Sequence, residues 1–181
     1  MTAECPILTG IFDGFSWIRC EGKGSFMNSP AMKEFGDGRI AAGERCLVVD
    51  LGACTGMDST FMGTLAGMAA RLSARDNGVL QIADPGSRNR RSLEDLGLDF
   101  ILEIDPPAAV WRGNLGPIRD GLRSPDSNSA GAFDRTMHVL EAHQTLSEAN
   151  EKNAKTFSTV VSLLKAELAD QQKPSGKDCG E

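Results

Sequence analysis

The strongest constraint on the fold is a short apolar run at residues 46–51, which reads CLVVDL. It is rich in aliphatic and β-branched residues and carries a single charge, at Asp50. Such a run is typical of a strand that is buried on both faces, and helices usually provide that cover. The run therefore predicts the central strand of an α/β sheet.

The segments on either side of this run complete the predicted sheet. Apolar and polar residues alternate at 7–12 and 15–20 around Asp13-Gly14, a dipeptide typical of a β-hairpin turn. The other expected elements are strands at 79–83 and 100–104 and helices at 29–42, 59–77 and 87–96. The predicted fold class is thus α/β, with a mixed β-sheet that is opened by a hairpin and covered by helices, in a domain spanning residues 1–105.

The composition changes after Asp105 to Pro, Gly, Ser, Asn and Asp, which indicates a linker at 106–131. Four apolar residues in it would nevertheless share one face of a short helix that docks on the domain: Trp111, Leu115, Ile118 and Leu122. The alternative is an extended tether.

Residues 132–171 lack Gly and Pro and predict a long amphipathic helix, and residues 172–181 a disordered polar tail. Steps of three and four residues connect His143, Leu146, Asn150, Asn153, Phe157, Val160 and Leu164. This incomplete heptad pattern is compatible with a dimeric coiled coil, which would make the chain a homodimer, and equally with a helix packed on its own domain.

Charge and composition exclude several classes of protein. The net charge of −6 argues against a nucleic acid partner, and the basic cluster Arg88, Arg90 and Arg91 is read as a solvated helix start. Five scattered cysteines form no CxxC pair and no zinc spacing, so we expect no metal and no cofactor. No apolar run is long enough for a membrane span and no signal peptide is visible, which predicts a cytoplasmic protein.

The residues that could carry chemistry lie where the chain leaves the central strand for the next helix, at Asp58, Ser59 and Thr60. Asp58 or Ser59 could simply cap this helix. A serine there is also a suitable phosphorylation site, because a phosphate meets free backbone amides and the positive end of the helix dipole. The added charge would then alter which partner can bind.

Residues 46–104 resemble the STAS domain of the anti-sigma-factor-antagonist family. The resemblance rests on VVDL, on the GMDSTFMGTL segment that contains Asp58-Ser59, and on the later LEDLGL. It implies that a partner serine kinase, an anti-sigma factor of the histidine-kinase-like ATPase type, phosphorylates Ser59, with Thr60 as a secondary acceptor. It also implies a serine phosphatase and partner contacts through Asp58, Ser59 and Thr60.

Two departures from the family pattern concern the partner. Phe61 and Met62 precede Gly63, where relatives usually have glycine directly after the acceptor, so we expect these apolar residues to contact the partner. The loop before the first helix carries Ser25, which we place at the border of the same surface. Residues 22–25, GKGS, lack the spacing of a phosphate-binding loop.

The sequence thus predicts a non-enzymatic switch that binds its kinase when Ser59 is unphosphorylated and releases it after phosphorylation. One alternative is a STAS scaffold or oligomerisation module in which Ser59 is only a cap. The other is a small hydrolase. It would need His138 or His143 beside a nucleophile, which requires the C-terminal helix to fold over the domain.

Overall fold

The computed structural model describes residues 6–125 and 132–172. Within them, five strands form one sheet in the order β1-β2-β3-β4-β5. β1 pairs antiparallel with β2, and the other neighbouring strands pair parallel. The strands are β1 (Ile7–Phe12), β2 (Phe15–Gly24), β3 (Cys46–Met57), β4 (Val79–Ala83) and β5 (Glu103–Ile104). The predicted mixed sheet opened by a hairpin is confirmed.

The central strand β3 is longer than the apolar run that predicts it. Its second half continues beyond Leu51 because it pairs with the second half of β2, from Glu21 opposite Ala53 to Gly24 opposite Met57. This pairing leads the chain directly to Asp58, whose backbone N–H donates to the carbonyl of Gly24 at 2.9 Å. The extension therefore brings the loop after β2 beside the start of the next helix.

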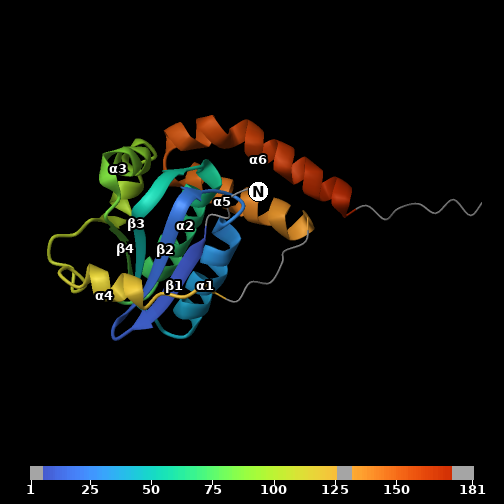
Figure 1. The fold of residues 1–181 in the computed structure, drawn as a ribbon. Coiled ribbons are helices and arrows are strands. Elements are labelled where there is room, and N and C mark those ends of the chain that lie inside the picture. The colour runs from blue at the N-terminus through green and yellow to red at the C-terminus, as the bar shows by residue number, and fades with distance from the viewer. Residues whose placement is uncertain (1–5, 126–131, 173–181) are drawn as a thin grey trace, which may run out of the picture.

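Three helices cover one face of the sheet (Figure 1): α1 (Ser29–Ala41), α2 (Ser59–Ser73) and α3 (Gly86–Asp95). They meet the strands in the main core, where Met32, Val49, Leu65 and Leu93 are fully buried. Burial of apolar surface of this kind is the main stabilising contribution to a fold.

The opposite face of the sheet is covered by the segment after β5. Its short helix α4 (Leu115–Asp120) buries Ile118, and the preceding Trp111 packs edge-on against Trp17 with ring centroids 5.5 Å apart. The Trp111 indole N–H donates to Gln81 Oε1 at 2.8 Å. The described part of the region predicted as a linker therefore lies against the sheet, while residues 126–131 fall outside the description.

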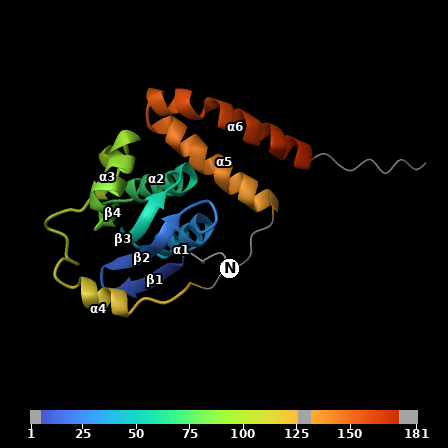
Figure 2. The ribbon, with the colours of Figure 1, turned by 45° about the horizontal axis from the view of Figure 1, so that its top comes forward.

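The C-terminal helical region is present but is divided in two, α5 (Ala132–Ala149) and α6 (Glu151–Gln171). Asn150 between them has extended backbone angles, and its side chain accepts a hydrogen bond from the N–H of Asn153 at 2.9 Å. This cap ends the single helix expected over 132–171, because an N-cap residue cannot continue the preceding helix. α5 packs between α2 and α6 (Figure 2). Of the predicted polar tail, residues 173–181 lie outside the described residues.

Candidate functional site

Asp58 connects the start of α2 to the loop after β2. One carboxylate oxygen accepts the N–H of Phe61 at 2.8 Å, which makes Asp58 the N-cap of α2, and the other accepts the N–H of Phe26 at 2.9 Å. Ser25 lies in the same loop, where its hydroxyl oxygen accepts the N–H of Met27 at 3.2 Å. The hydrogen bond to Phe61 confirms the prediction that Asp58 caps this helix. Asp58 and Ser25 are both half-buried, and they lie on neighbouring segments.

Ser59 is the first residue of α2, and it is half-buried against α5. Its hydroxyl oxygen lies 2.8 Å from Nε2 of His143, and Nδ1 of His143 lies 2.7 Å from the carbonyl oxygen of Val139. A carbonyl can only accept, so Nδ1 carries a proton, and in the neutral imidazole Nε2 then accepts a hydrogen bond from the Ser59 hydroxyl. The His143 ring is 6% exposed and packs edge-on against Phe157 of α6.

The three residues after Ser59 are buried. Thr60 is 4%, Phe61 0% and Met62 9% exposed, and Phe61 and Met62 belong to the main core. In this form none of Thr60, Phe61 and Met62 is exposed to a partner, and their predicted partner contacts stay predictions. The physical reason is that the first turn of α2 lies between the sheet and α5, so bulky apolar side chains there fill the core.

The contact between α2 and α5 depends on small residues. A Cβ atom added to Gly63 would lie 2.7 Å from the carbonyl carbon and 2.9 Å from the Cα of Ala142, so the two backbones are in direct contact. A Cβ atom added to Gly67, one turn later on α2, would lie 3.8 Å from the hydroxyl oxygen of Thr145 on α5. Glycines four residues apart allow two helices to approach this closely, and no side chain other than hydrogen fits at Gly63.

His138 adds a second polar contact between α5 and the domain. Its Nε2 lies 2.7 Å from the hydroxyl oxygen of Ser29 on α1 and 3.4 Å from that of Thr64 on α2. Burial, together with the positive charge of Lys33, lowers the pKa of His138 to about 4. His138 is therefore neutral at pH 7 and holds α5 against both helices.

His138 and His143 lie far in the sequence from Ser29 and Ser59, and a pair between them requires the C-terminal helices to fold over the domain. The C-terminal helices fold over the domain, and each histidine meets a serine hydroxyl. The cavity at the α2–α5 contact has a volume of about 20 Å³, and its lining includes His138 but neither Ser59 nor His143. This is room for one water molecule.

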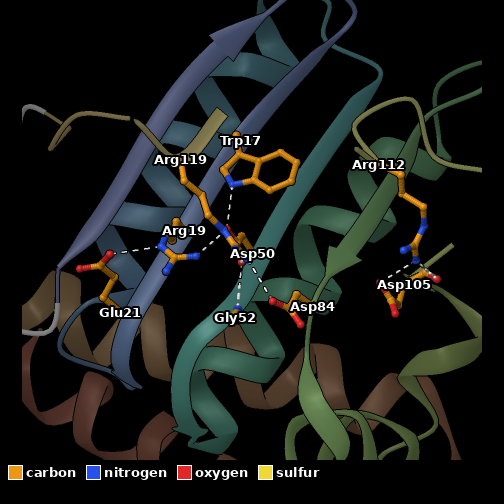
Figure 3. Close-up of polar contacts among 9 residues, drawn as sticks. All are labelled: Trp17, Arg19, Glu21, Asp50, Gly52, Asp84, Asp105, Arg112 and Arg119. Carbon is orange, nitrogen blue, oxygen red and sulfur yellow. Dashed lines mark hydrogen bonds and ion pairs between the residues drawn. The ribbon is translucent and has the colours of Figure 1, made fainter. Parts of the chain in front are cut away.

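Asp50, a residue of β3, forms a second polar centre with the side chains around it (Figure 3). This fully buried carboxylate accepts hydrogen bonds from Arg119 at 2.9 and 3.0 Å, from Arg19 at 2.8 Å, from the Trp17 indole at 3.2 Å and from the N–H of Gly52 at 2.9 Å. Burial would raise its pKa, but the hydrogen bonds from Arg119, Gly52 and Arg19 outweigh burial and lower it. Asp50 thus joins α4 to two strands.

Neither a metal-binding cluster nor a membrane-spanning helix occurs within residues 6–125 and 132–172. No group of three or more His, Cys, Asp or Glu side chains there is arranged to hold a metal ion. None of the helices in these ranges combines the length and the apolar character that a membrane crossing requires.

Three features define the class of domain: the sheet order, the helices on one face, and the serine that follows the Asp58 cap at the start of α2. The STAS domain family model matches residues 7–109, more than half of the chain, and the chain therefore belongs to the STAS domain family. The search of curated proteins found no match.

Two solved structures share the fold. An anti-sigma factor antagonist from Mycobacterium paratuberculosis is 22% identical, with a TM-score of 0.53, over 66% of this chain and 98% of its own. The protein TM1081 from Thermotoga maritima is 18% identical, with a TM-score of 0.51, over 61% of this chain and 92% of its own. Each of these alignments therefore leaves more than a third of this chain without a counterpart.

Proposed function

We propose that this chain is an interaction switch of the anti-sigma-factor-antagonist type, acting in the bacterial cytoplasm. Its partner is a serine kinase that also serves as the anti-sigma factor. Unphosphorylated Ser59 permits binding of the kinase, which frees a sigma factor or another client, and phosphorylated Ser59 ends it. A serine phosphatase restores the binding state. The proposal assigns no catalytic step to the chain itself.

The observation that carries this proposal is the position of Ser59 directly after the Asp58 cap of α2, in a STAS domain. Transfer of the γ-phosphoryl group of ATP to Ser59 Oγ forms an O–P bond, releases ADP and frees the hydroxyl proton. The product carries about −1.5 to −2 charges at the helix start, beside the Asp58 carboxylate. The helix dipole tolerates this charge, whereas a partner surface of acidic or apolar character does not.

The test uses the full chain and the kinases encoded next to its gene. With ATP present, peptide mass spectrometry should locate the phosphate on Ser59. In binding assays Ser59→Ala should bind the kinase at least as tightly as wild type and remain bound with ATP, whereas Ser59→Asp should bind at least tenfold more weakly. Ser87→Asp is the matched control, because Ser87 is an exposed serine in the first turn of α3. Wild-type affinity in both Ser59 variants would refute the proposal.

A further inference from the structure

The α5–α6 hairpin lies over the hydroxyl that the proposed function uses. We infer that this hairpin is an intramolecular inhibitor: in the closed form described here it covers Ser59, and it must move off α2 before the kinase can phosphorylate or bind that surface. The inference rests on the proposed function and adds a layer of regulation to it. The competitor of the partner is a segment of the chain itself.

The fit between α2 and α5 is too close for the closed form to tolerate another group between them. The backbone of Ala142 lies against Gly63, and His143 follows Ala142 directly and reaches the Ser59 hydroxyl at 2.8 Å. A protein that recognises Ser59 needs the space that these residues fill. Closure and partner binding therefore exclude each other.

The same contact makes closure and phosphorylation mutually exclusive. In the closed form Ser59 Oγ lies 2.8 Å from His143 Nε2, and a phosphoryl group on Oγ needs the space that the imidazole occupies. Because linked equilibria are reciprocal, closure makes the phosphorylation equilibrium less favourable by the same factor by which phosphorylation favours the open form.

The contacts that hold the hairpin favour a closed form that can open. Hydrogen bonds link His143 to Ser59 and His138 to Ser29, and the side-chain amides of Asn150 and Asn153 donate to the carbonyl of Leu96 at 3.1 and 2.9 Å. Water can replace each of these partners when the hairpin leaves, so every bond contributes little net free energy. The hairpin contributes Leu146 to the main core and packs the half-buried Phe157 against it, while Leu140, Ala142 and Leu168 are buried outside that core.

The domain is complete without the hairpin. The STAS match ends at residue 109, and the mycobacterial structure aligns over 98% of its length with only 66% of this chain. The sheet and the helices α1 to α3 all precede residue 132. Movement of α5 and α6 therefore leaves the sheet and its main helices intact.

Access to position 59 tests the inference without any kinase. In a full-length Ser59→Cys variant, we would measure the rate at which a maleimide labels the introduced thiol, using peptide mapping to separate it from the native cysteines. Adding Gly63→Ala should accelerate labelling at least tenfold, because the new methyl group collides with the Ala142 backbone. Gly38→Ala is the matched control, since Gly38 lies in α1, is exposed and has open space around it. It should leave the rate unchanged.

Equal labelling rates with and without Gly63→Ala would overturn the inference, because the contact between α2 and α5 would then not control access to position 59. A second measurement compares Ser59 phosphorylation by the partner kinase in wild type and in the single variant Gly63→Ala. Faster phosphorylation in the variant supports the inhibitor role. If Ser59 is phosphorylated in both proteins at the same rate, the inhibitor role is overturned and the proposed function stands. Absence of phosphate on Ser59 in both proteins, even with faster labelling, overturns the proposed function and with it the inhibitor role.

Discussion

Asp50 shows how a single residue holds two layers of this domain together. It has no exposed surface, and a buried carboxylate is stable only when its charge is compensated. Arg19 on β2 provides one cation and Arg119 on α4 the other. Arg119 also contacts Asp84 at 3.1 Å, so α4 is attached to the sheet by an ionic network as well as by Trp111 and Ile118.

We predict that Asp50→Asn lowers the free energy of unfolding by about 3–5 kcal/mol, the usual effect of removing one partner from a buried ion pair. The amide keeps an acceptor but removes the buried charge that both guanidinium groups share, and leaves Arg19 with Glu21 and Arg119 with Asp84, two carboxylates that are more exposed. Urea denaturation at pH 7 measures the change. Glu94→Gln is the control, because Glu94 forms an exposed pair with Arg90 at 3.7 Å, and pairs of that kind contribute about 0–1 kcal/mol.

The same substitution makes a prediction about acid stability. The pKa of Asp50 is lowered in the folded protein, so its contribution is present above the unfolded value of about 3.9 and is lost as the pH falls below it. Wild type should therefore lose more stability than Asp50→Asn between pH 5 and pH 2. Parallel stability curves over this range would contradict the assignment of Asp50 as the ionised centre of the network.

At the scale of elements, Asn150 determines the shape of the C-terminal region. Its side chain caps α6 and also donates to the carbonyl of Leu96. We predict that Asn150→Ala destabilises the protein by about 1–2 kcal/mol, as for other lost caps, and that hydrogen exchange becomes faster in α6 but not in β3. Asn114→Ala is the control, because Asn114 precedes α4 without a capping side-chain bond. Unchanged exchange in α6 would show that the cap does not hold the turn.

The elements that could be predicted from the sequence are those with local signals. The hairpin around Asp13-Gly14 and the buried strand at Leu47–Leu51 need only their own residues to be recognised, and both appear where expected. The break at Asn150 was missed because Asn is also compatible with a heptad seam. What decided between the two was the carbonyl of Leu96, more than 50 residues earlier in the sequence, which a periodic pattern does not contain.

The site was predictable only in part for the same reason. Asp58 and Ser59 were found because a capped helix start after a buried strand is a local pattern. The contact between Ser59 and His143 joins residues 84 positions apart, and sequence reasoning did not place the histidine there. The available signal was the spacing of Gly63 and Gly67, since two glycines on one helix face indicate close packing by another helix.

At the scale of the whole molecule, His138 couples the hairpin to the domain. Its imidazole touches α1 through Ser29 and α2 through Thr64, while Lys33, Asp58 and Asp37 are the charged groups that act on it. In the closed form the pKa of His138 is about 4, whereas a solvent-exposed histidine titrates near 6.5. Opening the hairpin therefore takes up a proton at any pH between these two values.

This difference predicts that mild acid opens the hairpin. As the pH falls from 7 to 5 the open form becomes protonated and the closed form does not, so the closed form should lose stability relative to the open one by on the order of tenfold. Protection factors from hydrogen exchange in α5, corrected for intrinsic rates, measure this change. In His138→Gln, whose side-chain amide can either donate to or accept from the Ser29 hydroxyl, protection should no longer depend on pH in this range. An equal pH dependence in the variant would assign the effect to another group.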